Sequence, residues 1–282
     1  MPKKSTPIQV VTWNVARRDA SVLDALEKAV GRTSQLDLLT LQEVAPHRAE
    51  DFRDRLVKMD LKHVYYTAHL DLPCLCEINV IGSRWPLDAT ELRYPRKELP
   101  WPQALTRGSV SVNGRSIFVV TAHIPNGTRH GWEKIDTFKV LKELVLQAKG
   151  TPFIVTGDFN EPQYHRLVNG HILTWGQEHN GPDYWEEWTF GGRTGKGQDW
   201  DKPVRWLFEK VEEHGLRNAY WEAHGKGAMD VSHVTTGKKR RWFDHMFVSP
   251  HFGVEQCEYL HKLRGPGLSD HSALGAKLLL KA

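Results

Sequence analysis

One segment, residues 153–160, restricts the possible folds more than any other part of the chain. It begins with the apolar and β-branched run Phe-Ile-Val-Thr, follows Pro152 and stops at Gly157, which predicts a short strand buried on both faces. Asp158 and Asn160 come directly after it. In open α/β sheets, functional groups collect at the carboxyl ends of such strands, because the strand fixes the backbone and the following loop carries the polar groups. Alone, the Gly-Asp pair is more typical of a simple turn, so a functional interpretation needs matching strand ends elsewhere.

Other predicted strands repeat this arrangement, with a polar side chain at the end of an apolar run. The pairs are residues 8–13 with Asn14, residues 37–42 with Glu43, and residues 115–122 with His123. Nearer the end of the chain, Asp244 stands within an apolar segment, and Asp270 and His271 precede a last predicted strand at residues 273–280. A carboxylate among apolar residues needs a charged or hydrogen-bonding partner, so we expect one for Asp244.

The segments between these strands alternate between helical and hairpin patterns. Apolar residues recur at helical spacing in three segments, residues 21–30, 46–59 and 131–149. The Asn113-Gly114 pair between two apolar runs is the signature of a tight β-hairpin. Hairpins mixed with crossover helices predict an α/β fold with mixed sheets. A chain of 282 residues with 40% hydrophobic content can bury one large core, so we expect a single domain over its whole length.

Residues 165–233, which we call the Trp-rich segment, break this pattern and are expected to form an insertion. Six of the eleven tryptophans of the chain lie between Trp175 and Trp221. Residues 204–214 form the clearest predicted helix of the segment. Tryptophan faces would provide a stacking platform for nucleobases. The interpretation we favour is that the large rings hold a long and poorly periodic insertion in place.

The charge balance favours an anionic partner without identifying one. The formal net charge is +4, and residues 238–241 form a run of four cations. Such runs are usually solvated surface, and contact with phosphates is the functional interpretation we favour. No apolar h-region of a secretory signal and no apolar run of membrane-spanning length is present, so we expect a cytoplasmic protein without a membrane anchor. Nothing in the sequence predicts a protein partner.

Six short motifs follow one another along nearly the whole chain. They are Thr12-Trp13-Asn14, Leu41-Gln42-Glu43, Thr121-Ala122-His123-Ile124-Pro125-Asn126, Gly157-Asp158-Phe159-Asn160, Phe243-Asp244-His245 and Ser269-Asp270-His271. In these motifs and their order the sequence resembles the endonuclease/exonuclease/phosphatase superfamily, which includes exonuclease III-like abasic-site endonucleases, deoxyribonuclease I, sphingomyelinases and inositol polyphosphate phosphatases. The resemblance implies a four-layer α/β sandwich of two mixed β-sheets flanked by helices, the deoxyribonuclease I-like fold.

The resemblance also implies a metal-dependent hydrolase of phosphoester bonds. Glu43, with Asn14 and Asp270 as further ligands, would hold Mg²⁺, or Mn²⁺ in its place, through oxygen atoms. Asp158 would orient and deprotonate the attacking water, and Asn160 would donate hydrogen bonds to the phosphate oxygens.

Two histidines complete the implied catalytic set. His271, oriented by Asp244, would stabilise the phosphate as a cation or hydrogen-bond donor. His123 would contact the phosphate or the leaving oxygen. The implied substrate-binding residues are Asn14, Asn126 and Arg129.

Three positions separate the sequence from the abasic-site endonucleases of this superfamily. His123 stands where those enzymes have tyrosine, Ala16 where they have aspartate, and Ala45 where they have lysine, so abasic-site specificity is not expected. The cations and the tryptophans favour a nuclease that acts on DNA. The alternatives are a phosphatase or lipid phosphodiesterase of inositol-phosphate or sphingomyelinase type, and a binding module that has lost catalysis. The last is the weakest, because the residues that catalysis needs are all present.

Overall fold

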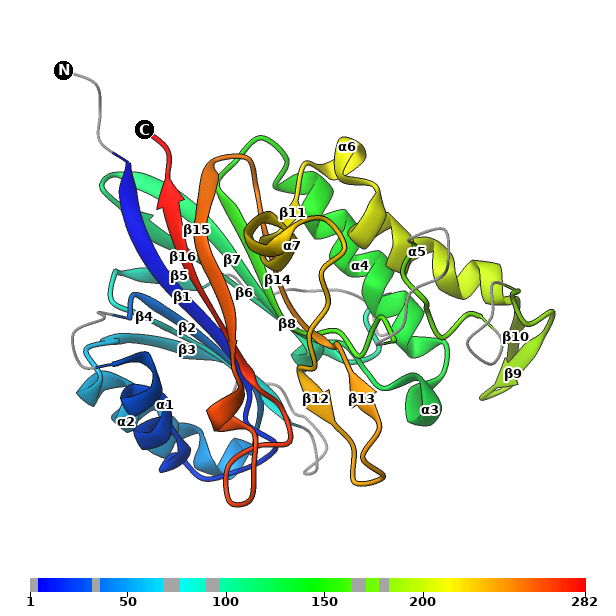
Figure 1. The fold of residues 1–282 in the computed structure, drawn as a ribbon, viewed down its shortest axis with the longest axis horizontal. Helices are drawn as coiled ribbons and strands as arrows, with labels where there is room; N and C mark the ends of the chain where they lie inside the picture. The colour runs from blue at the N-terminus through cyan, green and yellow to red at the C-terminus, as the bar shows by residue number, and fades with distance from the viewer. Residues whose placement is uncertain (1–4, 32–35, 68–76, 90–96, 164–170, 178–182) are drawn as a thin grey trace.

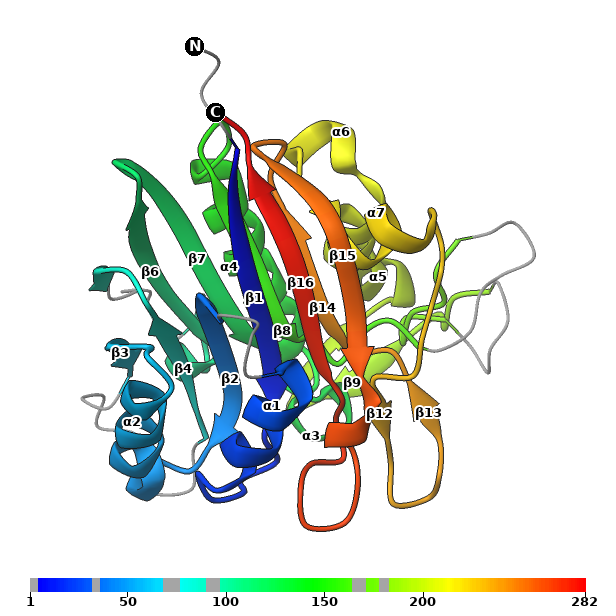
Figure 2. The ribbon, with the colours of Figure 1, turned by 60° about the vertical axis from the view of Figure 1, so that its left-hand side comes forward.

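The computed structural model describes residues 5–31, 36–67, 77–89, 97–163, 171–177 and 183–282. Within these residues, two six-stranded β-sheets pack face to face, with helices on their outer faces (Figure 1). Figure 2 shows the two layers of strands from a second direction. Both sheets combine parallel and antiparallel neighbours. The prediction of an α/β sandwich with two mixed sheets is confirmed.

Strands that are far apart in the sequence are neighbours in these sheets. The order of the first sheet is β15 (Phe252–Leu260), β16 (Ala273–Leu280), β1 (Thr6–Asn14), β2 (Leu38–Val44), β4 (Ile78–Ser83) and β3 (His63–Tyr66). The order of the second sheet is β11 (Arg217–Asn218), β14 (Asp244–Val248), β8 (Phe153–Asp158), β7 (Arg115–His123), β6 (Leu105–Val112) and β5 (Leu87–Ala89). A parallel pair lies at the centre of each sheet, β1 with β2 and β7 with β8, between antiparallel neighbours. The carboxyl ends of the two strands of each pair therefore lie at the same end of their sheet.

The helices bury the outer faces of the two sheets. The apolar faces of α1 (Val22–Val30) and α2 (Ala49–Lys58) pack on the first sheet in one cluster with residues such as Trp13 and Leu41. The second sheet is covered by α4 (Glu133–Gln147) and α5 (Gly197–Glu209), while α7 (Ala219–His224) contacts β14 and β15. The short elements are η1 (Pro46–Arg48), η2 (Pro102–Ala104), α3 (Gly127–His130), β9 (Trp188–Phe190), β10 (Arg193–Gly195), α6 (Val211–His214), β12 (His233–Val234), β13 (Arg240–Arg241) and η3 (His261–Leu263). Among the described residues, none of the helices has the length and apolar character needed to span a membrane.

The interface between the two sheets changes from apolar to polar along the strands. Its apolar end contributes residues of both sheets to one buried cluster, among them Ile8, Val10, Leu38, Ile117, Val119 and Ile154. Toward the carboxyl ends of the parallel pairs, Thr40 Oγ1 lies 2.8 Å from Thr156 Oγ1, and Gln42 Nε2 donates to Thr121 Oγ1 at 2.8 Å. These residues continue the same inward faces at the two-residue period of a strand. Polar side chains of both sheets therefore meet inside the sandwich toward the carboxyl ends of the parallel pairs.

Most local predictions agree with the structure. The strands predicted at residues 8–13, 37–42, 115–122 and 273–280 correspond to β1, β2, β7 and β16. Asn113 (φ 51°) and Gly114 (φ 77°) both adopt the left-handed conformation that a tight primed hairpin turn requires, between β6 and β7.

The helix predicted for residues 204–214 is wrong in its bounds. The structure has α5 from Gly197 to Glu209, and Lys210 (φ −103°, ψ 49°) separates it from α6. Pro203 lies inside α5, although proline usually marks a helix boundary. Burial of Trp200, Val204 and Leu207 on one face stabilises the helix through this position. Of the Trp-rich segment, residues 171–177 and 183–233 are described.

Candidate active site

The carboxyl ends of the four parallel strands meet between the two sheets. β1 ends at Asn14, β2 carries Glu43, β7 ends at His123 and β8 ends at Asp158. Asn14 Nδ2 donates to Glu43 Oε1 at 2.8 Å and to Asp158 Oδ2 at 3.0 Å, which joins the two sheets. His123 Nε2 lies 3.4 Å from Glu43 Oε1 and 4.0 Å from Asp158 Oδ2. Four of the predicted site residues thus form one cluster.

Uncommon backbone conformations direct these side chains. Gly157 has φ 131°, and a Cβ there would lie 1.9 Å from the carbonyl oxygen of Ala122, so glycine is required where β7 and β8 approach closely. Glu43 has φ 56° and lies where the pairing of β2 with β4 shifts register. Asn160 has φ 51°, and its backbone N–H donates to Asp158 Oδ1 at 2.8 Å. Such conformations in non-glycine residues cost about 1–3 kcal/mol each and cluster at functional sites.

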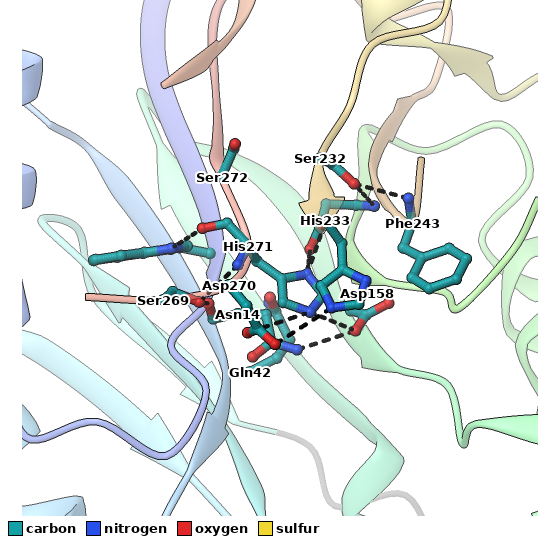
Figure 3. A network of polar contacts seen from close by, with 12 residues as sticks. Asn14, Gln42, Asp158, Ser232, His233, Phe243, Ser269, Asp270, His271 and Ser272 are labelled. Atoms are coloured by element: carbon teal, nitrogen blue, oxygen red, sulfur yellow. Dashed lines mark hydrogen bonds and ion pairs between the residues drawn. The ribbon is translucent and has the colours of Figure 1, made fainter. Parts of the chain in front are cut away.

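Asp244 has the partner that its burial requires. His271 Nδ1 lies 2.9 Å from Asp244 Oδ2. Its Nε2 lies 3.8 Å from Asp158 Oδ2, on the opposite strand end (Figure 3). Burial alone would lower the pKa of His271, but the negative charges of Asp244 and Asp158 outweigh it and raise this pKa to about 10. The side chain of His271 is therefore an imidazolium at neutral pH.

The backbone around His271 is tied to the end of β1. The indole Nε1 of Trp13 donates to the carbonyl oxygen of His271 at 3.1 Å. Ser269 Oγ donates to the carbonyl oxygen of Asn14 at 2.7 Å and accepts from the N–H of His271 at 3.0 Å. These buried bonds fix the loop before β16, so the imidazolium is held in one place relative to the first sheet.

Asp270 belongs to a different group of side chains from Glu43. Its Oδ2 lies 3.3 Å from His233 Nε2, and the ring of His233 stacks on that of His271 with centroids 4.2 Å apart (Figure 3). Burial would raise the pKa of Asp270, but the hydrogen bond from His233 and the charge of His271 lower it to about 2. Asp270, His233 and His271 form one of the groups that could hold a metal ion. The ligand role of Asp270 beside Glu43 stays a prediction.

A second group with metal-ligand geometry lies between the sheets. One ligand atom each of Glu43, His123 and Asp158 lies within 4.8 Å of the others. Carboxylate oxygens suit hard cations such as Mg²⁺ and Mn²⁺, so the donor set fits a divalent ion. Asn14 faces these carboxylates with its amide nitrogen, while its Oδ1 accepts from the N–H of Ala16 at 2.9 Å. In this orientation Asn14 offers a hydrogen-bond donor, not the ligand oxygen that was predicted.

The remaining predicted residues lie at the rim. Asn160 Nδ2 donates to the carbonyl oxygen of Ile124 at 3.0 Å. Asn126 is the N-cap of α3, where its Oδ1 accepts from the N–H of Thr128 at 2.8 Å. Arg129 is exposed in the last turn of α3. Asn126 and Arg129 therefore lie just after the end of β7, and their substrate-binding role stays a prediction.

Sequence reasoning missed two members of the site. Glu77 lies close enough to Glu43 that burial and the charge of Glu43 raise its pKa, while His123 and Arg17 oppose this. Glu77 precedes β4, and β4 runs antiparallel to β2, so the start of β4 lies beside the end of β2. A polar residue just before a strand that is antiparallel to β2 is therefore the signal that could have identified Glu77. His233 reaches the site through a β-bridge with His271, for which the sequence contains no local signal.

Comparison with known proteins identifies the family. Residues 11–271 match the model of the Endonuclease/Exonuclease/phosphatase family. The chain has no match among the curated proteins. An AP endonuclease from Archaeoglobus fulgidus shares 15% identity with a TM-score of 0.66, over 95% of this chain and 98% of that chain. TDP2 from D. rerio, complexed with a single-strand DNA product, shares 14% identity with a TM-score of 0.60, over 97% of this chain and 99% of that chain. The 3′ phosphatase NExo from Neisseria, bound to a product DNA hairpin, shares 18% identity with a TM-score of 0.60, over 95% of this chain and 98% of that chain.

The structural similarities extend over nearly the full length of each chain and agree with the two-sheet sandwich. The family match contains all six sequence motifs, from the end of β1 to His271, together with the carboxylates and histidines that the fold gathers between the sheets. The chain therefore belongs to the endonuclease/exonuclease/phosphatase family and is a metal-dependent phosphoester hydrolase.

Proposed function

We propose that this hydrolase is a magnesium-dependent phosphodiesterase that acts as a nuclease on DNA. The observation that carries the proposal is the β12–β13 hairpin, which extends from the site (Figure 1, Figure 2). Its turn exposes Lys238, Lys239 and Arg240, and its first strand forms a β-bridge from His233 to His271. Cations on a hairpin attached to the catalytic imidazolium favour a substrate with phosphates beyond the scissile one. Two of the similar structures contain DNA, which agrees with this substrate class.

The chain supplies a base and a cation side by side in the site, since His271 Nε2 lies 3.8 Å from Asp158 Oδ2. Asp158, 1% exposed, accepts the proton of the attacking water, with its carboxylate oriented by Asn14 and by the N–H of Asn160. His271, kept protonated by Asp244, stabilises the negative charge that develops on the phosphate oxygens. Because these side chains are held by buried hydrogen bonds, the site needs little rearrangement to reach the productive geometry.

The remaining groups bind rather than react. Glu43 is the oxygen ligand that would hold Mg²⁺, and a divalent cation bound there would offset the charge of the scissile phosphate. His123, which lies between the carboxylates of Glu43 and Asp158, contacts the phosphate or the leaving oxygen. Asn126 and Arg129 contact the neighbouring phosphates from α3.

A substrate panel tests the proposal. The purified protein is incubated with supercoiled plasmid, single-stranded and abasic oligonucleotides, a phosphoinositide and sphingomyelin, each with Mg²⁺ and with chelator. We expect cleavage of the DNA substrates in Mg²⁺ and none in chelator. Cleavage restricted to the inositol or lipid substrates would replace the nuclease with the phosphatase or lipid phosphodiesterase of the same family.

The hairpin cations should control the salt dependence of DNA binding. Replacement of Lys239 and Arg240 with glutamine is expected to lower the slope of log Kobs against log salt by about 1 for each phosphate that is no longer neutralised, with equal effects on unrelated DNA sequences. Binding is measured by fluorescence anisotropy with the Asp158→Asn variant. The matched control replaces Lys28 and Lys58, exposed on the helices outside the first sheet, and should keep the slope. An unchanged slope in the hairpin variant would exclude this surface as the DNA-binding one.

The metal assignment predicts a loss of affinity at Glu43. Glu43→Gln removes one negative ligand and should weaken Mn²⁺ or Mg²⁺ binding by more than about 10-fold, the loss found even for groups that only support a ligand. Isothermal titration of the metal-free protein measures it, with Glu212→Gln on α6 as the exposed control. If Glu43→Gln binds normally and Asp270→Asn does not, the ion is held by the group around His233 instead.

A further inference from the structure

A cavity of about 470 Å³ lies beside the catalytic cluster. It is lined by the loop after β8, by α3, by described residues of the Trp-rich segment and by the β12–β13 hairpin. Its volume falls in the range of ligand pockets, about 300–1,000 Å³. The hydrolysis of the phosphoester itself does not use this cavity.

Aromatic rings form much of the wall, and protein hydrogen bonds hold them in place. Trp175 Nε1 donates to the carbonyl oxygen of Asn160 at 3.1 Å, and Trp185 Nε1 donates to the carbonyl oxygen of Trp175 at 2.8 Å. Trp188 packs against Trp185 and Trp200 with ring centroids 5.6 and 5.2 Å apart. The rings are therefore ordered before any ligand arrives, which lowers the entropic cost of binding.

The charges around the cavity balance one another. Lys134 and Glu161, 0% exposed, form a buried pair at 3.2 Å beneath it. Of the other described lining residues, Arg241 lies over the ring of Trp175 at 4.9 Å and Glu187 has the opposite charge. A ligand with several phosphates, such as an inositol polyphosphate, would need an excess of cations here. An uncharged flat ring is the ligand that this wall suits.

The cavity shares walls with the catalytic cluster. Asn160 and His233 line it, and both also belong to the site described above. The ring of His233 lies between two others, stacked on Phe243 at 5.5 Å and on His271 at 4.2 Å. A phosphate bound against His271 would therefore have a substituent next to the cavity.

We propose that the cavity binds the nucleobase on one side of the scissile phosphodiester, and that it makes the enzyme prefer linkages flanked there by a base in an unpaired strand. The proposal rests on the nuclease function and names its substrate more closely. A base inside a duplex is stacked on its neighbours, so it reaches the rings only from a single strand, a frayed end or a flipped position. The side chains of Thr128 and Thr235 line the same cavity and supply polar groups for the edge of the base.

Two measurements test the proposal. In the first, single-stranded oligonucleotides carry one tetrahydrofuran residue, which lacks a base, moved stepwise along the strand. We expect kcat/KM for a linkage to fall by about 10-fold or more when the base on one defined side is absent, since stacking of a base contributes about 1–3 kcal/mol. In the second, binding of dAMP and of deoxyribose 5-phosphate to the metal-free protein is compared by calorimetry, and dAMP should bind more tightly by a similar factor.

Variants of the tryptophans locate the effect. Trp188→Ala should bring the ratio of kcat/KM between base-bearing and base-lacking substrates close to one, and Trp188→Phe should retain most of it. The control is Trp85→Ala, because Trp85 follows the end of β4 and does not line the cavity. Cleavage that ignores the missing base at every position, or equal affinity for dAMP and deoxyribose 5-phosphate, overturns the cavity assignment and leaves the nuclease function standing. Failure to cleave any oligonucleotide overturns the nuclease function itself, and tighter binding of dAMP would still support a base pocket.

Discussion

Replacement of Asp158 with asparagine should lower kcat by about 10²–10⁴-fold, the contribution of a positioned general base. The carboxylate is 1% exposed and lies close to Asn14, His123 and His271. It is therefore the carboxylate in the centre of the cluster, which is the position that a general base needs. Asparagine has the same shape and can accept the hydrogen bond from the N–H of Asn160, but it cannot take up a proton at neutral pH. The loss should therefore appear in kcat with little change in substrate affinity.

Steady-state kinetics on the best substrate of the panel measure this effect, and circular dichroism confirms that the variant folds. Asp88→Asn on β5, an exposed aspartate in the same sheet, is the matched control and should retain full activity. A folded Asp158→Asn variant with normal turnover would remove Asp158 from the mechanism.

Replacement of Asp244 with asparagine should change the pH dependence of the enzyme. The charges of Asp244 and Asp158 hold the pKa of His271 at about 10, above its ordinary value of 6.5. The stabilisation from this raised pKa is fully present below pH 6.5 and is lost as the pH rises through about 10. Without the charge of Asp244 the pKa should fall by about 1–3 units, so the alkaline loss of activity moves toward neutral pH. At neutral pH a ring with a pKa of about 7–9 stays at least about half protonated, so the loss of activity there should be about 2-fold or less and should grow as the pH rises.

Two experiments check the change at His271. An NMR titration of the metal-free protein gives the pKa of the ring directly, and the pH profile of kcat shows its effect on catalysis. Asp230→Asn is the control, because Asp230 lies 2.9 Å from His261 in an exposed histidine-carboxylate pair and its loss should leave His271 unchanged. If the titration of His271 is the same in the Asp244→Asn variant, the buried pair does not hold its charge.

The sequence allows much of the site to be predicted, because the site consists mainly of strand ends. An apolar run followed by a polar residue identifies Asn14, Glu43, His123 and Asp158, and the parallel pairing of their strands places them at one edge. The partner of Asp244 follows from the cost of burying a carboxylate. These inferences depend on local patterns and on general rules of sheet packing.

The missed features depend on contacts that no local pattern records. His233 joins the site only because the β12–β13 hairpin folds back against the loop before β16. In the Trp-rich segment, burial on one face carries α5 through Pro203, where local preference favours a boundary. The favoured interpretation of the tryptophans was packing, and the rings of Trp185, Trp188 and Trp200 do pack on one another, but they also line the cavity beside Asn160.

The change from apolar to polar along the inter-sheet face has a mechanical consequence. The donor Asn14 belongs to one sheet and the acceptor Asp158 to the other, so the distance between them reports how the two layers are aligned. The hydrogen bond between Thr40 and Thr156 joins the same two sheets two residues before Asp158 on β8. A substitution that shifts one sheet relative to the other, even at the apolar end of the interface around Ile8, should lower kcat at temperatures well below the melting temperature.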